Sequence, residues 1–163
     1  MRAMSTITRS TDMEEFMRAV GLTSAELLET LKGLAQDGFV VKTGKGFAIA
    51  EKGNLALTAL TPLPDESAFQ FYLDVGRPLA VSARSIKEFY DVVNTVDADS
   101  LEFHLGRGDF ENWVKTAIGD GLLARELEAL RREGLKGEVL RKQLLLSLVS
   151  RFGEDVLRRE WMP

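Results

Sequence analysis

Residues 27–57 read LLETLKGLAQDGFVVKTGKGFAIAEKGNLAL, and this stretch decides the fold expected for the first third of the chain. It opens with an amphipathic helical pattern that Gly38 is expected to end. The apolar face of this helix is expected to hold Leu27, Leu28, Leu31, Leu34 and Ala35. Two apolar segments then flank the Gly-rich turn at residues 43–46, which predicts a β-hairpin, and a short helical pattern follows over residues 51–60.

Two capping boxes precede this stretch. Thr23 and Glu26 have the spacing in which a hydroxyl and a carboxylate satisfy the first N–H groups of a helix. Thr11 and Glu14 repeat the pattern one helix earlier, and Gly21 is a typical end signal for that helix. The order predicted for the segment is therefore helix, tight turn, helix and hairpin.

Over about residues 10–60 this order resembles the winged helix-turn-helix family. The resemblance implies a module that docks on DNA or on another protein. A further helix normally precedes these two, and only about ten residues precede Thr11. We therefore expect a truncated winged helix, whose first helix is missing, very short, or supplied by another segment or subunit.

The charges of this segment leave the docking partner open. Glu26 and Glu29 lie on the outward side of the expected recognition helix, where carboxylates would repel the DNA backbone. Lysines on this helix and around the hairpin would instead attract phosphates. The candidate residues for binding nucleic acid or a partner are Lys32, Lys42, Lys45 and Lys52. DNA and a protein partner therefore remain alternatives, and ordinary solvated lysines are a third.

Composition excludes several classes of protein. The 163 residues include no cysteine and a single histidine, so disulfides, thiolate catalysis and the usual transition-metal sites are not expected. No apolar run reaches the roughly 18 residues needed to cross a bilayer, and the first ten residues do not form a secretory signal. Residues 61–120 carry five Lys or Arg against eleven Asp or Glu, so the charge pattern does not indicate a basic face for nucleic acid, although it does not forbid one. We expect a cytoplasmic protein without cofactor, metal or membrane partner.

The second half of the sequence predicts a separate domain. Residues 61–68 contain two prolines and no apolar periodicity, which indicates a linker between a domain at 1–60 and another at 69–163. The aromatic segment at 69–81 predicts one strand or an extended segment, and helical patterns follow from Ser85 to the end. Helix starts are predicted at capping boxes of Ser85 with Glu88 and of Asp99 with Glu102, and at a cap by Asp120. The fold class expected is mainly α with a small β-hairpin: a truncated winged helix followed by a helical domain.

Five separate pieces of this second domain resemble an uncharacterised, mainly archaeal domain family. The shared pattern is A-x-S-x-x-EF, then SL-x-x-H, DF-x-x-W, GD-x-x-LA and a late LR, over about residues 69–150. The matching residues are Ala83, Ser85, Glu88 and Phe89; Ser100, Leu101 and His104; Asp109, Phe110 and Trp113; Gly119, Asp120, Leu123 and Ala124; Leu140 and Arg141. The resemblance implies a common fold, but it brings no known activity with it.

The single histidine, His104, admits three interpretations. It could act as a general base oriented by Glu102 or Asp109, although no activated nucleophile accompanies it. It could instead be a structural residue in a helix corner, with Asp109 capping the next helix and Arg107 pairing with an acidic neighbour. The third alternative is a ligand or partner site in which His104 and Arg107 hold an anion. The structural interpretation is favoured, and no catalytic residue is assigned.

Two further features have alternatives. The apolar helix at 135–152 is expected either to be a central packed helix or to form a homodimer seam. The basic tail holds Arg151, Arg158 and Arg159 beside Trp161, and it either contacts nucleic acid or forms a solvated last helix.

The functional prediction is a non-enzymatic regulatory or adaptor protein whose winged helix docks on DNA, as a transcription regulator would, or on protein. The second domain would serve sensing or oligomerisation, and a small hydrolase or ligand-binding protein using the His104 region is the remaining alternative.

Overall fold

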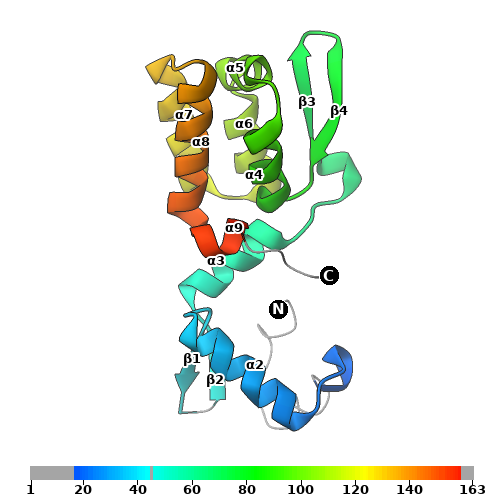
Figure 1. Ribbon diagram of the computed structural model, residues 1–163, viewed down its shortest axis with the longest axis vertical. Helices are drawn as coiled ribbons and strands as arrows, with labels where there is room; N and C mark the ends of the chain where they lie inside the picture. Colours follow the sequence, from blue (N-terminus) through cyan, green and yellow to red (C-terminus); the bar gives the residue numbers. More distant parts are fainter. Residues whose placement is uncertain (1–16, 45, 159–163) are drawn as a thin grey trace. The chain divides into compact units, whose positions relative to one another are not determined.

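The computed structural model describes residues 17–44 and 46–158, which are mainly helical with two small β-hairpins (Figure 1). The contacts divide the chain into two compact units, Met1–Leu57 and Thr58–Pro163. Within the described ranges, no helix has both the length and the apolar character that crossing a membrane requires.

The first unit contains a helix, a hairpin and the start of a second helix. Residues 17–20 are also helical, and they precede the turn at Gly21. The elements that follow are α2 (Ser24–Gln36), β1 (Val40–Thr43), β2 (Gly46–Ile49) and α3 (Glu51–Leu60). Strands β1 and β2 pair antiparallel, with Val40 opposite Ile49 and Thr43 opposite Gly46. The predicted order of helix and hairpin is therefore present in the described residues.

Helix α2 begins where the capping box predicts. The Thr23 hydroxyl accepts a hydrogen bond from the Glu26 N–H, and the Glu26 carboxylate accepts one from the Thr23 N–H. Leu27 and Leu31 are buried, but Leu28 is 48 % exposed, so its expected place on the apolar face is wrong. One position along a helix is a rotation of about 100°, which carries Leu28 off the face that Leu27 occupies. The earlier box at Thr11 lies outside the described residues.

Close packing joins α3 to the base of the hairpin. Phe39 is fully buried, and its carbonyl oxygen accepts a hydrogen bond from the Ala50 N–H. A Cβ atom built on Gly53 would lie 2.2 Å from that same oxygen, so only glycine allows this approach. Lys52 also faces inward: its ammonium donates to the Asp37 carbonyl at 2.8 Å and lies 4.5 Å from the centre of the Phe39 ring.

The second unit is a hairpin packed on a bundle of helices. Strands β3 (Phe69–Asp74) and β4 (Arg77–Ala83) pack on α5 and α4, and α8 lies on the other side of those helices (Figure 1). The helices are α4 (Ile86–Thr95), α5 (Ala98–Arg107), α6 (Asp109–Trp113), the π-helix η3 (Val114–Ile118), α7 (Gly121–Glu133), α8 (Gly137–Phe152) and α9 (Glu154–Arg158). The aromatic core between hairpin and helices holds Phe69, Phe71, Phe89, Phe110 and Trp113.

Where the sequence predicts one strand or an extended segment, the structure has two antiparallel strands. Gly76 has a φ of +80° in the turn between them, a conformation that glycine adopts without strain. Pro78 is accepted within β4 because the register is irregular between Gln70 and Tyr72 and because β4 pairs on one side only. The expected linker at 61–68 includes a short 3₁₀ helix, η2 (Asp65–Ser67), and the Ser67 carbonyl accepts a hydrogen bond from the Trp113 indole.

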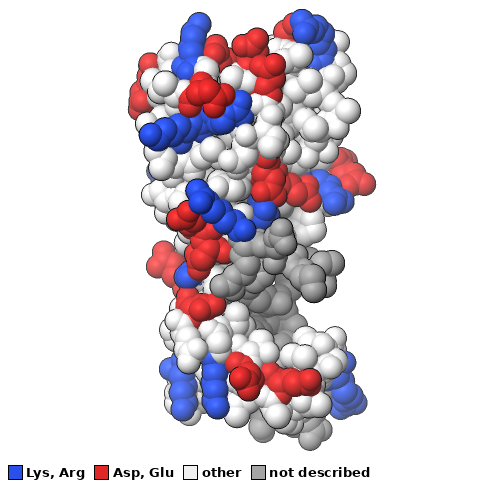
Figure 2. Space-filling model, in the orientation of Figure 1, with Lys and Arg blue, Asp and Glu red and all other residues white. Residues whose placement is uncertain are grey.

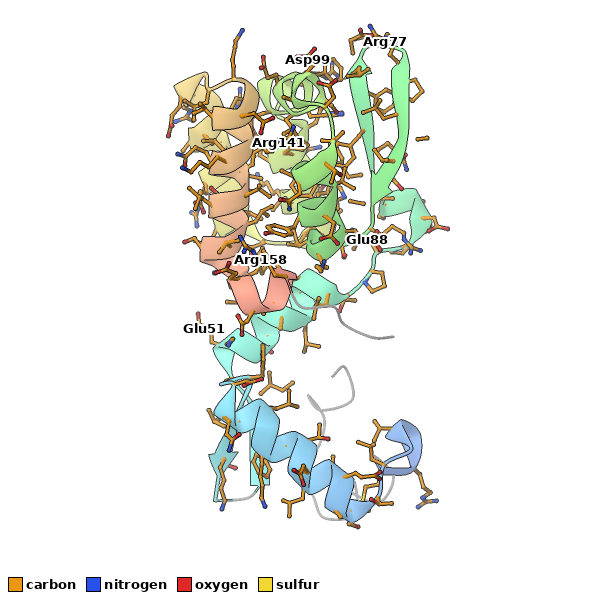
Figure 3. The ribbon with its side chains drawn as sticks, in the orientation of Figure 1. Glu51, Arg77, Glu88, Asp99, Arg141 and Arg158 are labelled. Atoms are coloured by element: carbon orange, nitrogen blue, oxygen red, sulfur yellow. The ribbon has the colours of Figure 1, made fainter. Side chains whose placement is uncertain are left out.

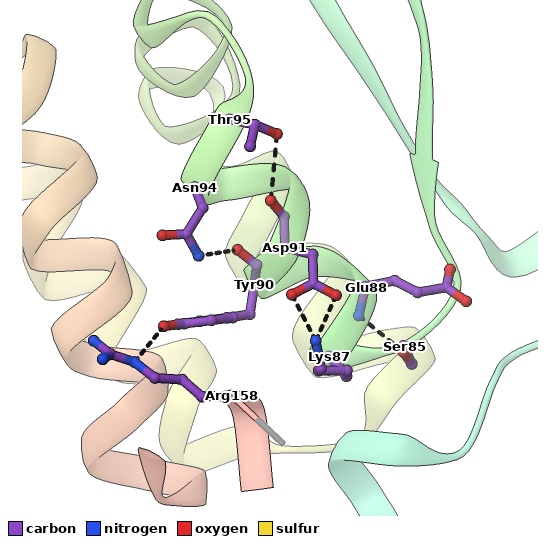
Figure 4. Close-up of polar contacts among 8 residues, drawn as sticks. All are labelled: Ser85, Lys87, Glu88, Tyr90, Asp91, Asn94, Thr95 and Arg158. Atoms are coloured by element: carbon purple, nitrogen blue, oxygen red, sulfur yellow. Dashed lines mark hydrogen bonds and ion pairs between the residues drawn. The ribbon is translucent and has the colours of Figure 1, made fainter. Parts of the chain in front are cut away.

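Side-chain caps mark the starts of α2, α4, α5 and α7. The Ser85 hydroxyl accepts the Glu88 N–H at the start of α4, which is one half of the predicted capping box, and Figure 4 shows this bond with the other polar contacts along the helix. The Glu88 carboxylate accepts from the Arg84 N–H and not from Ser85, so the other half is not formed. Asp120 caps α7 through the N–H groups of Leu122 and Leu123, also as predicted. The expected cap at Asp99 is wrong, because Asp97 accepts the Asp99 N–H and begins α5 two residues earlier.

Helix α8 packs against α4, α5, α7 and α9, which agrees with its prediction as a central helix. Leu140, Leu144 and Leu148 are buried, while Val139 is 58 % and Leu146 49 % exposed. The homodimer seam stays a prediction, since those two side chains make only a narrow apolar strip.

Candidate functional site

His104 lies in the core of the second unit, between α5 and the β3–β4 hairpin. Its side chain is 3 % exposed and is surrounded by rings, with centroids 4.8 Å from Phe69, 5.0 Å from Phe103 and 5.5 Å from Phe110. The strand that it faces belongs to a segment more than thirty residues earlier in the chain. The histidine therefore joins a helix to a strand, where the sequence predicts a link between two helix ends.

Hydrogen bonds fix the protonation state of the ring. The Tyr72 backbone N–H donates to Nε2 of His104 at 2.8 Å, so Nε2 must carry a lone pair. Nδ1 therefore carries the hydrogen, and it donates to Oδ2 of Asp109 at 2.8 Å. Both nitrogens of the neutral ring are engaged within the protein. A general base needs a free nitrogen within reach of a substrate proton, so this geometry opposes the catalytic interpretation.

Asp109 connects the histidine to solvent-facing Arg107. Its Oδ2 atom also accepts from Nε of Arg107 at 3.2 Å, which agrees with the expected pairing of that arginine. The expected cap role of Asp109 is wrong: Gly108, in the left-handed conformation, precedes α6, and Asp109 is the first residue of that helix. Glu102, the other candidate for orienting His104, instead accepts the Gly137 N–H at 2.8 Å.

Burial has a direct electrostatic consequence for His104. Loss of water around the ring lowers the pKa of His104 below its ordinary value of 6.5, and the nearby charge of Arg107 lowers it further. The Asp109 carboxylate raises the pKa again through its hydrogen bond and its charge, without reversing the direction. The ring is therefore neutral at neutral pH, as the hydrogen bond from Tyr72 requires.

A pocket of about 350 Å³ opens beside this network, and its size falls within the range usual for small-molecule sites. Phe69 and Tyr72 from β3 and Phe103 from α5 line it with aromatic surface. Arg107 and Asp109 supply charged groups, and the guanidinium of Arg107 lies 5.2 Å from the centre of the Phe103 ring. Of the predicted residues, the structure thus brings His104, Arg107 and Asp109 together at one pocket.

The sequence does not single out the aromatic walls of this pocket. Tyr72 falls in the aromatic segment that predicts a strand, and no sequence pattern singles out Phe103. For Phe69, which also lines the pocket, the alternation of β3 was a signal: Phe69 and Phe71 are buried and the intervening Gln70 is exposed. Phe103 precedes His104 on the same helix. Only the packing of β3 against α5 shows that Phe103 and the aromatic residues of β3 border one pocket.

The predicted basic residues of the first unit that the structure describes differ in their exposure and contacts. Lys32 on α2 and Lys42 on β1 are exposed, whereas Lys52 is held by Asp37 and Phe39. Lys45 lies outside the described residues. Figure 2 shows basic side chains over the β1–β2 hairpin and acidic side chains along α2. Hydrogen bonds from Thr23 lower the pKa of the exposed Glu26 carboxyl.

Searches for similar proteins returned no matching family model, curated protein or solved structure for this chain.

Proposed function

We propose that the chain is a non-enzymatic regulatory or adaptor protein of the cytoplasm, whose residues 1–60 form a truncated winged helix that docks on a protein partner. The proposal rests chiefly on the outward surface of α2. Glu26 and Glu29 are exposed there, and hydrogen bonds from Thr23 lower the pKa of the Glu26 carboxyl. A helix that presents carboxylates is poorly suited to the phosphate backbone and better suited to a basic protein surface.

The arrangement of lysines supports the same choice. Lys52 was one of the expected phosphate contacts, but its ammonium caps the carbonyl of Asp37. Lys32 and Lys42 are the exposed candidates among the described residues. Two lysines would provide few of the phosphate contacts on which non-specific DNA binding depends.

The non-enzymatic part of the proposal is supported by His104, whose two nitrogens both bond within the protein. The second unit would then act as a sensor or an oligomerisation unit. Its resemblance to a mainly archaeal domain family remains part of this proposal.

A reversal of charge on α2 tests the docking surface. Purified chain with Glu29→Lys is compared with wild type in pull-downs from the native host, with Glu126→Lys on α7 as the control for the same change of charge. We expect a protein partner that is retained by wild type and by the control but lost with Glu29→Lys. A partner retained equally by all three would contradict this surface.

DNA binding is tested separately, because a winged helix could serve either partner. Mobility shifts with duplex DNA at low salt are compared between wild type and Lys32→Glu with Lys42→Glu. We expect no shift for wild type. A shift that salt weakens and the two substitutions abolish would replace the protein partner with DNA.

A further inference from the structure

We infer that the pocket between β3 and α5 binds a flat aromatic molecule that carries one anionic group. This pocket belongs to the second unit and does not depend on the docking role proposed for α2. Its binding can be measured without any partner, so either proposal can fail alone.

The walls of the pocket argue for a flat aromatic body. Phe69, Tyr72 and Phe103 contribute rings from two different elements, and the exposed surface inside is mainly apolar. Aromatic side chains attract a planar ring by edge and face contacts in addition to burial of area. A volume of about 350 Å³ would accept a molecule of two or three rings.

The charges around the pocket argue for one anionic group. Asp109 already accepts hydrogen bonds from His104 and Arg107, and Asp74 is paired with Arg77 at 2.9 Å. Figure 3 shows Arg77 near the turn of the hairpin. The two carboxylates of the pocket are therefore compensated within the protein, and they would oppose an anion only weakly.

Arg107 supplies the attraction. Among the described residues its guanidinium bonds only through Nε, to Asp109, and its side chain is 55 % exposed. The terminal nitrogens of that group are therefore free to donate to a carboxylate or a sulfonate. Arg107 also borders a second hollow of about 610 Å³, between α6 and α7. Lys115, Arg125 and Arg131 line it as well, together with the carboxylates of Glu111 and Glu128, and Glu111 is paired with Arg131.

The experiment compares two dyes that share one aromatic body. The anionic dye is 8-anilinonaphthalene-1-sulfonate, and N-phenyl-1-naphthylamine is its uncharged analogue. Fluorescence titrations use the full chain, with near-ultraviolet circular dichroism to confirm that each variant keeps native packing. We expect saturable binding of the anionic dye at one molecule per chain, and weaker binding of the uncharged dye.

Two variants and a control assign the binding. Arg107→Gln should raise the Kd of the anionic dye at least fivefold and leave the uncharged dye unchanged, because only the anionic dye has a charge-assisted hydrogen bond to lose. Phe103→Leu should weaken both dyes, and Arg132→Gln, which removes an equal charge outside the pocket on α7, should change neither. Binding that survives both Arg107→Gln and Phe103→Leu would overturn the site, and equal losses of both dyes with Arg107→Gln would overturn the anionic group.

Discussion

The ring of His104 contributes hydrogen bonds and packing, and replacement by phenylalanine separates the two. The variant His104→Phe keeps an aromatic ring of similar shape but leaves the Tyr72 N–H and the Asp109 carboxylate without that partner. Because a buried group without its hydrogen bond is costly, we expect the free energy of unfolding to fall by roughly 1–3 kcal/mol. Urea denaturation followed by tryptophan fluorescence measures the change. An unchanged midpoint would show that packing alone stabilises this position.

The same histidine should make stability depend on pH. Burial lowers the pKa of folded His104 below the unfolded value of 6.5, so the unfolded chain takes up a proton first as the pH falls. The stabilisation from the neutral ring is complete above about pH 6.5 and decreases as the pH falls toward the folded pKa. Protonated Nε2 would also face the Tyr72 N–H donor to donor. We expect the Tm of wild type to fall more steeply than that of His104→Phe between about pH 7 and pH 5, where histidine titrates. Parallel curves would contradict this.

At the scale of the element, two helical glycines in the first unit make a matched pair. Gly53 on α3 would bring a Cβ atom to 2.2 Å from the Phe39 carbonyl oxygen, whereas a Cβ on Gly33 of α2 meets nothing within 4 Å. Gly53→Ala should therefore destabilise the unit by roughly 3 kcal/mol, since backbone must shift to relieve the overlap. Gly33→Ala should stabilise it by about 1 kcal/mol, because alanine favours the helix. Far-ultraviolet circular dichroism in urea distinguishes them, and equal effects would contradict the packing of α3 on the hairpin.

Asp120 performs two roles at the start of α7, and two substitutions separate them. One carboxylate oxygen caps the helix, and the other accepts from Nε of Arg151 on α8 at 2.9 Å. Asparagine can still cap, so Asp120→Asn should cost about 1 kcal/mol, for the ion pair with the partly exposed arginine. Asp120→Ala loses the cap as well and should cost roughly 2 kcal/mol. Thermal unfolding gives both values, and equal losses would mean that the cap contributes nothing.

Local chemistry explains which elements the sequence could predict. Thr23, Ser85 and Asp120 mark helix starts through bonds to residues two or three positions away, and all three caps are present. The hairpin β3–β4 was missed because Pro78 reads as a break, although an unpaired strand edge accepts it. A pattern within one element can be recognised in the sequence. Whether a strand tolerates a proline depends on whether another strand pairs with that edge.

For the whole molecule, contacts between distant segments decide the candidate site. Arg107 and Asp109 lie two residues apart, so their pairing could be predicted from the sequence. The hydrogen bond from the Tyr72 N–H to His104 spans 32 residues and depends on how β3 packs against α5. Nothing in the local pattern specifies that packing. The residue types of the site were therefore predictable, whereas the pocket and the tautomer of the histidine were not.

The division of the chain into two compact units predicts two unfolding transitions. Among its described residues, the first unit buries few large side chains, Leu27, Leu31 and Phe39 among them, while the second buries a cluster of aromatic rings and the leucines of α5, α7 and α8. Since burial of apolar surface supplies most of the stability, we expect the first unit to melt at the lower temperature.

Differential scanning calorimetry should show this, and two variants assign the transitions. Gly53→Ala should lower only the first Tm, and His104→Phe only the second, because each substitution acts on contacts within one unit. A loss of 1 kcal/mol moves the Tm of a small domain by roughly 4–8 °C, so both shifts are measurable. Helix α3 runs through the boundary between Leu57 and Thr58, and a single transition lowered by both variants would mean that this helix makes the units unfold together.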